Sequence, residues 1–152
     1  MARRYAATGL NACAASPGKT ACNTFQTSNT IRPRFFDIIF GSDGTPADNA
    51  LRFRVSRSTA VGTEGTGVVP VALDSADPAA LMDSSEGHSA EPTYTAATEV
   101  LDVPLNQRAT FRWVCAPDGE VICPATAANG LGVAAIHASY VGNCEAVMHW
   151  QE

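Results

Sequence analysis

Histidines, cysteines and clustered carboxylates are the residues of this chain whose types could do chemistry. A hydrolytic triad needs a Ser or Cys nucleophile, a His and an acid. His88 lies in a polar segment, whereas His137 and His149 lie near apolar neighbours late in the chain. No Gly-x-Ser-x-Gly nucleophile elbow occurs in the sequence. We therefore interpret the histidines as surface or structural residues and predict that the protein is not an enzyme.

Metal binding has two weak candidates in the sequence. Zinc sites are built from closely spaced Cys and His pairs. One late region holds the possible ligands Cys115, Cys123, His137, Cys144 and His149. It contains no Cys-x-x-Cys pair, so its spacing is not that of a zinc knuckle. The loop from Asp43 to Asp48 offers carboxylates that suit Ca²⁺, but its residue order matches no EF-hand and is explained by a turn. We expect no metal and no cofactor.

The number of cysteines is odd, so at least one of the five is unpaired within a monomer. Cys13 and Cys22 flank a short loop and could form a bridge if oxidised. Cys115 and Cys123 flank a Pro-Asp-Gly turn, which places them on neighbouring strands. In a protein of the reducing cytoplasm we expect free, mostly buried thiols. The sequence leaves the state of each cysteine open, including Cys144.

Alternation of apolar and polar residues predicts the elements that position these side chains. It is clearest over residues 51–55 and 109–113. Strict alternation is typical of half-buried antiparallel strands. Strands are predicted over residues 31–40, 51–57, 68–73, 93–95, 98–105, 109–115, 120–123, 132–139 and 144–150. The one helical candidate is residues 74–84, where Asp or Ser can cap a short apolar turn.

These strands predict an all-β protein with a jelly-roll-like antiparallel β-sandwich and an extended N-terminal arm. Residues 1–28 are assigned to the arm because they are mostly small or polar. Residues 29–152 are assigned to the β-sandwich domain. The predicted core shares one phase along the strands and consists of Phe36, Ile38, Phe40, Leu51, Phe53, Val55, Phe111, Trp113, Met148 and Trp150.

Charge limits the class of partner. The net charge of −5 over 152 residues argues against a general nucleic-acid binder. No apolar run approaches the length of a membrane span. Arg3 and Arg4 are not followed by the apolar stretch of a signal peptide, so we expect synthesis in the cytoplasm. The arginines gather in the first sixty residues, either to dock on an acidic partner or to pair with local carboxylates on a solvated sheet.

Several segments carry a family resemblance. They are RSTAVGT at 57–63, LDSADPAA at 73–80, EPTYT at 91–95, PLNQRATFRWV at 104–114, ICPATAANG at 122–130 and MHWQE at 148–152. Together they resemble a group of small virion-associated proteins encoded by tailed bacteriophages, over roughly residues 30–152. Within that group the composition is similar to capsid cement or decoration proteins, which are small, β-rich and often trimeric.

The resemblance implies a structural virion protein that binds the major capsid protein on the outer surface of a phage head and stabilises the shell. It also implies a homotrimer located in the virion after synthesis in the bacterial host. A head fibre, a tail component or a receptor- or carbohydrate-binding β-module remains the alternative. Arginine makes forked contacts to carboxylates and Tyr supplies rigid contact area. We therefore expect the capsid interface to include Arg3, Arg4, Tyr5, Arg32 and Arg34.

Overall fold

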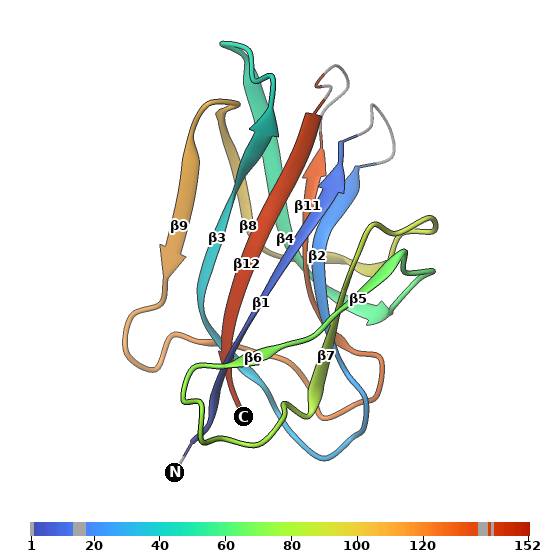
Figure 1. Cartoon of the computed structure of the whole chain (residues 1–152), viewed down its shortest axis with the longest axis vertical. Helices are drawn as coiled ribbons and strands as arrows, with labels where there is room; N and C mark the ends of the chain where they lie inside the picture. Colours follow the sequence, from blue (N-terminus) through green and yellow to red (C-terminus); the bar gives the residue numbers. More distant parts are fainter. Residues whose placement is uncertain (1, 14–17, 137–139, 141) are drawn as a thin grey trace.

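Twelve strands and no helix form in the part of the chain that the computed structural model describes, residues 2–13, 18–136, 140 and 142–152. They make two antiparallel sheets of six strands each (Figure 1). Sheet A contains β1 (Arg4–Ala12), β3 (Arg34–Gly44), β6 (Val71–Ala72), β9 (Thr110–Val114), β10 (Val121–Ile122) and β12 (Gly142–Gln151). Sheet B contains β2 (Lys19–Gln26), β4 (Ala50–Ala60), β5 (Thr66–Val68), β7 (Met82–Glu86), β8 (Thr93–Asn106) and β11 (Gly130–Ile136).

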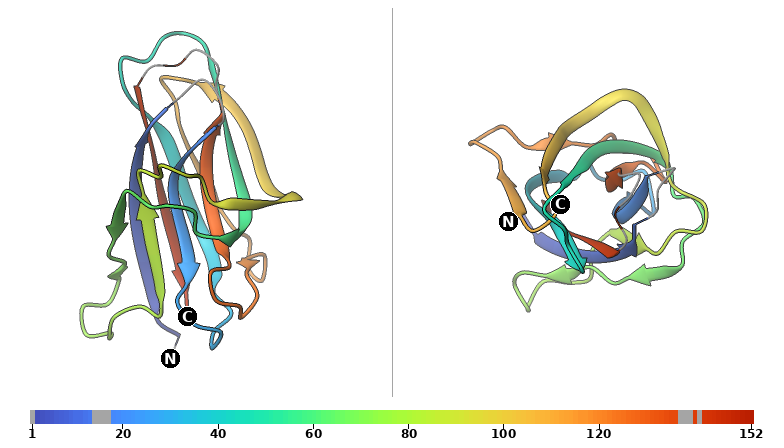
Figure 2. Two further views of the ribbon diagram at one scale, coloured as in Figure 1. Left: turned by 90° about the vertical axis from the view of Figure 1, so that its right-hand side faces the viewer. Right: turned by 90° about the horizontal axis from the view of Figure 1, so that it is seen from above.

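The two sheets pack as layers of a sandwich (Figure 2). Strands of sheet A follow the order β10-β3-β12-β1-β6, with β9 also paired to β3. Strands of sheet B follow the order β5-β7-β2-β11-β4-β8. The chain changes sheet at every connection except β4–β5, β7–β8 and β9–β10. The predicted all-β antiparallel sandwich is thereby confirmed.

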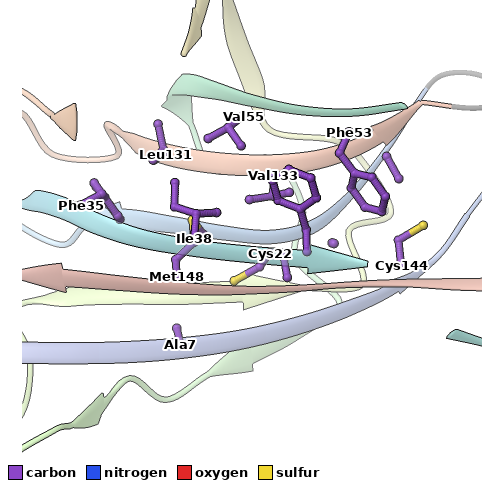
Figure 3. Packing of buried hydrophobic residues seen from close by; sticks show 14 of the residues in the cluster. Ala7, Cys22, Phe35, Ile38, Phe53, Val55, Leu131, Val133, Cys144 and Met148 are labelled. Atoms are coloured by element: carbon purple, nitrogen blue, oxygen red, sulfur yellow. The ribbon is translucent and has the colours of Figure 1, made fainter. Parts of the chain in front are cut away.

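The core lies between the inner faces of the two sheets. Figure 3 shows Phe53, Val55 and Val133 of sheet B on the side facing Ile38 and Met148 of sheet A. The rings of Phe40 and Phe53 stack across the layers with their centroids 4.8 Å apart. Among the predicted core residues, those that are fully buried are Ile38, Phe40, Leu51, Phe53, Val55, Met148 and Trp150.

Three predicted core residues are only half-buried. A register shift between β3 and β12 pairs His149 with Asp37 and Trp150 with Phe35, so β3 has an extra residue at Phe36. This bulge reverses the phase of the strand, and Phe35 points inward in place of Phe36. Phe111 and Trp113 pack against the core from β9, whose second edge has no neighbouring strand in the described sheet.

The prediction of an N-terminal arm outside the core is wrong. β1 lies between β12 and β6 in sheet A, and β2 lies between β7 and β11 in sheet B. Tyr5 and Cys22 are fully buried there. Small residues allow the strands to approach closely: a Cβ at Gly9 would lie 2.7 Å from the Cβ of Cys22. The small side chains of this segment fit the short distance between the two sheets. A core is packed when side-chain volumes match the space available, so a buried strand does not need large apolar residues.

The helix predicted over residues 74–84 is also absent from this described stretch. The backbone N–H of Asp77 donates to the carbonyl of Asp74 at 3.0 Å, which forms a single turn. Pro78 follows, and β7 begins at Met82. The Glu152 carboxylate accepts the backbone N–H groups of Leu81 and Met82. These N–H groups therefore bond a side chain from the far end of the chain instead of a helical carbonyl. Nowhere in the described residues is there a helix that could span a membrane.

One disulfide joins Cys13 to Cys144, and Cys22, Cys115 and Cys123 are free. The pairing follows from the register of sheet A, where β1 and β12 are neighbours and the backbone N–H of Cys13 donates to the carbonyl of Gly142. The expectation of free thiols is wrong for this pair. The alternative Cys13–Cys22 bridge is wrong as well, because Cys13 is bonded to Cys144 and Cys22 is free. The remainder of the predicted strand 132–139, residues 137–139, lies outside the described residues.

Candidate functional site

The outer face of sheet A brings two of the predicted interface residues together. Arg4 of β1 and Arg34 of β3 are both register partners of Gln151 on β12, so the three side chains form one row across the sheet. Alternation places all three outward because Tyr5, Phe35 and Trp150 point inward. Both arginines are exposed. The row therefore offers two guanidinium groups to solvent across three adjacent strands.

An aromatic pair supports this row from the neighbouring positions. The bulge in β3 turns Phe36 outward, where its ring stacks on the His149 ring with centroids 6.1 Å apart and planes 18° apart. The guanidinium carbon of Arg4 lies 5.4 Å from the centroid of Phe36. A cation over an aromatic face is attracted to the ring and held in place. The bulge thus converts a predicted core residue into part of an exposed surface.

A third guanidinium completes the face. Arg112 of β9 donates two hydrogen bonds to the carboxylate of Asp37, at 3.0 Å from Nε and 2.6 Å from Nη2. Nδ1 of His149 lies 3.4 Å from the same carboxylate. The Arg112 side chain is 61% exposed whereas that of Asp37 is 7% exposed. Hydrogen bonding to Asp37 raises the pKa of Arg112. The cation therefore faces solvent while its counter-charge lies beneath it.

We call this surface the arginine face and define it as Arg4, Arg34, Phe36, Arg112, His149 and Gln151. A hollow of about 260 Å³ adjoins it, between the row and the turn after β9. Val114 lines the hollow and is 56% exposed. Cys115 also lines it, and burial is the main cause that raises the pKa of its thiol. The face combines guanidinium donors with a recess lined by apolar side chains and by Glu120, which suits contact with another protein surface.

The other predicted interface residues lie elsewhere. Tyr5 is fully buried and its hydroxyl donates to the carbonyl of Pro78 at 3.0 Å, so it cannot contact a partner. That prediction is wrong, because alternation along β1 turns every second side chain inward. Arg3 lies at the end of the sandwich, with its Nε 4.0 Å from the carboxylate of Asp77. Arg32 is exposed in the connection that precedes β3.

Sequence reasoning missed a buried Ser–His contact on sheet B. The Ser85 hydroxyl and Nε2 of His88 lie 2.9 Å apart, and both residues are buried. Nδ1 of His88 has no hydrogen-bond partner among the described residues, so no acid orients the ring as in a triad. Desolvation by burial is the main cause that lowers the pKa of His88. The sequence around Ser85 and His88 is polar, so nothing in it indicated that these two side chains are buried.

The candidate metal ligands are not brought together. Cys144 is bonded to Cys13, and His137 lies outside the described residues. The described residues contain no group of three or more His, Cys, Asp or Glu that could hold a metal ion. Of the predicted Asp43–Asp48 turn, Asp43 and Gly44 form the end of β3, where the Asp43 carboxylate accepts the backbone N–H of Gly44 at 2.6 Å.

The arginine face is thus the most distinctive surface of the described chain, built by register, by one bulge and by one forked ion pair. It presents guanidinium donors and an aromatic ring on the outer side of one sheet. When the chain is compared with family models, with curated proteins and with solved structures, nothing matches it.

Proposed function

We propose that this protein is a structural component of a tailed-phage virion, a capsid cement or decoration protein that binds the outer surface of the head and stabilises the shell. The arginine face is the observation that carries the proposal. The exposed guanidinium groups of Arg4 and Arg34 can each make forked bonds to carboxylates of a shell protein, whereas Arg112 already forms such a pair with Asp37. The sheet beneath them fixes the spacing of the backbone positions that carry them, and the Phe36 ring lies against the guanidinium group of Arg4.

We also infer that the sandwich is a jelly roll. Two runs of neighbouring strands support this: β1-β12-β3-β9 in sheet A and β2-β11-β4-β8 in sheet B. In both runs an early strand pairs with a late one, as expected of a chain that wraps around itself in two Greek keys. The strands β5, β6 and β7 then form an insertion that widens both sheets. Jelly rolls are frequent in viral capsid domains, which agrees with the proposed location.

The disulfide agrees with a virion location too. Disulfides persist in oxidising surroundings such as virion surfaces and are rare inside the reducing cytoplasm. A protein made in the host cytoplasm can form the Cys13–Cys144 bond after release from the cell. The bond would then link one end of β1 to β12, and these two strands carry three members of the arginine face at their other ends.

We further propose a homotrimer, closed through the β6 edge of sheet A. Beside this edge strand lies a run of exposed apolar side chains: Val69 is 82%, Val71 is 65% and Leu73 is 53% exposed. Apolar residues on an open strand edge invite pairing with another chain. A head-to-tail contact of this kind closes into a ring when the rotation permits it. Light scattering should report a trimer that Val71→Asp converts to monomers, while Leu10→Asp, on the outer face, should leave the trimer intact.

Co-sedimentation tests the capsid proposal. The purified protein is mixed with heads of the phage that encodes it, prepared without this protein, and the heads are pelleted. We expect bound protein in the pellet and heads that withstand higher temperature. The double variant Arg4→Gln/Arg34→Gln should bind at least tenfold more weakly, about 1.4 kcal/mol or more. Arg52→Gln is the control, because this exposed arginine pairs with Asp102 on sheet B.

Two results would contradict the capsid proposal. One is that the wild-type protein stays in the supernatant at every concentration. The other is that the double variant and the control lose binding equally, since that would show only a general effect of charge.

A further inference from the structure

A groove opens on the outer face of sheet B, on the side of the molecule opposite the arginine face. Its volume is about 520 Å³, within the range of pockets that hold small molecules. Its lining residues come from β4, β8 and β11 and from the segments that precede β2 and β8. Nothing in the proposed capsid role uses this groove.

An irregularity in β8 creates the groove. Ser56 of β4 pairs with Glu99, and Ser58 pairs with Tyr94, so residues 95–98 bulge out opposite a single residue. Ala97 in this bulge has φ of 58°, a left-handed conformation that is unfavourable for any residue with a side chain. Backbone strain of this kind gathers at binding sites. The bulge is closed by a hydrogen bond of 2.8 Å from the Thr98 hydroxyl to the carbonyl of Thr95.

The floor of the groove is hollow because its residues are small. Ala134 of β11 and Ala96 of the bulge both line it, and Gly18 closes one end. Tyr94 forms part of the wall, and its ring rests on β11 at Gly132. A Cβ at Gly132 would lie 2.8 Å from the ring carbon Cε1 of Tyr94, so only glycine leaves room for the ring here. The tyrosine is thereby fixed as an aromatic surface beside the hollow.

The charges at the groove cancel in pairs. Nζ of Lys19 lies 3.1 Å from the carboxylate of Glu91, and Nη1 of Arg54 lies 3.7 Å from that of Glu99. Glu91 also accepts the backbone N–H of Thr20 at 2.8 Å. Nη2 of Arg54 also lies 3.2 Å from the carboxylate of Asp102, so each of these charged groups already has a partner of opposite charge. An uncharged ligand is therefore favoured.

The polar groups that remain match hydroxyl groups. Nε of Arg54 is buried and has no acceptor in the described structure. The carboxylate of Glu99 and the hydroxyl of Ser56 line the same groove. A ligand hydroxyl can accept from a guanidinium and donate to a carboxylate at the same time. The apolar C–H face of a sugar ring packs on an aromatic side chain, and Tyr94 supplies one.

We propose that this groove binds an uncharged pyranose unit of a glycan, held between the Tyr94 ring and the Arg54–Glu99 pair. The proposal stands independently of the capsid role, because it uses the opposite sheet and different residues. It gives the protein a second surface that could contact a cell-surface polysaccharide while sheet A holds the shell.

Saturation-transfer NMR on the full chain tests the proposal. The probes are methyl glucoside, methyl galactoside, methyl mannoside and N-acetylglucosamine, with glucuronate and glucosamine as charged counterparts. We expect transfer to at least one uncharged sugar and weaker transfer to the charged ones. Ala96→Phe should fill the hollow and abolish the signal, and Glu99→Gln should weaken binding about tenfold. Ala127→Phe is the matched control, since Ala127 is an equally exposed alanine in a loop of the other end of β11.

Three results would overturn the proposal: no uncharged sugar of the panel binds, the charged sugars bind more tightly, or Ala96→Phe binds as the wild type does. Thermal unfolding of each variant confirms that it is folded before binding is compared. Co-sedimentation with heads should be unchanged in Ala96→Phe, so failure here and failure of the capsid role are separate outcomes.

Discussion

The two outer faces of the sandwich use the same alternation of side chains in different ways. On sheet A the outward positions carry long side chains such as Arg4, Phe36 and Arg112, and they are left uncovered. On sheet B the outward positions of β11 carry Gly132 and Ala134, and the bulged part of β8 crosses near them. Residue size at outward positions therefore distinguishes the uncovered strands of sheet A from the part of sheet B that β8 crosses.

The two sheets also differ in what fixes them. Sheet A has a covalent link between the Cys13 end of β1 and β12. Sheet B relies on buried polar contacts, such as the hydrogen bond of 3.0 Å from the Ser58 hydroxyl to Oδ1 of Asn23. A covalent link is sensitive to reductant, whereas closely packed buried groups are sensitive to added volume and, at His88, to pH. Each difference can be tested separately.

The largest expected effect is on the covalent link of sheet A. The disulfide closes a loop with a sequence separation of 131 residues. The chain-entropy estimate for a loop of this size is about 4–5 kcal/mol of stability. Cys13→Ser should lower the free energy of unfolding by that order, as measured in urea, and should make it insensitive to dithiothreitol. Cys115→Ser is the control because Cys115 is free. Wild-type stability that reductant leaves unchanged would contradict the prediction.

The second test adds volume to each outer face. Gly132→Ala places a methyl group where Tyr94 already lies, so we expect a loss of about 1–3 kcal/mol in the free energy of unfolding. Gly→Ala at an unhindered site would instead stabilise by about 0.4–1 kcal/mol. Ala6→Val on the outer face of sheet A is the matched change, and it should stay within about 0.5 kcal/mol of wild type. Equal effects at the two positions would remove the distinction between the faces.

The third test uses pH. Burial lowers the pKa of His88, so the unfolded chain binds a proton at a pH where the folded chain does not. The full stability of the folded chain is therefore present above the ordinary histidine pKa of about 6.5. Stability is lost as the pH falls below 6.5 toward the lower pKa that His88 has in the folded chain. Urea unfolding near pH 7.5 and near pH 5.5 should show a smaller decrease for His88→Gln than for wild type. The same decrease in both proteins would show that another group is responsible.

The smallest effect on stability is expected at the arginine face. Arg34→Gln removes an exposed side chain that no core residue depends on, so the free energy of unfolding should change by less than about 0.5 kcal/mol. Its binding to heads should weaken and should become less sensitive to salt. A large loss of stability would mean that the face supports the fold instead of a partner.

Alternation was sufficient to predict the strands whose inward residues are large. β4 and β12 were found in this way, and Phe53 and Trp150 are buried as expected. It failed for β1 and β2, because their inward residues are mostly as small as Ala7 and Ala21 and carry no apolar signal. It misplaced Phe36 because a bulge adds one residue without marking the sequence.

The candidate site was predicted in part. Clustering of arginines pointed to Arg4 and Arg34, but only the register with Gln151 shows that they share a row. The contribution of Arg112 could not be predicted, because its partner Asp37 lies 75 residues away in the sequence. Contacts between strands distant in sequence decide the geometry of both outer faces, and no local pattern encodes them.

The bond between Cys13 and Cys144 turns most of the polypeptide into a closed ring with two short tails. A protease that cuts one exposed connection inside the ring opens it but releases no fragment, since both pieces remain joined through the sulfur atoms. The cut protein would migrate as one species in a non-reducing gel and as two species after reduction. A protein built in this way can be nicked once inside the ring and still hold every strand of both sheets in one molecule.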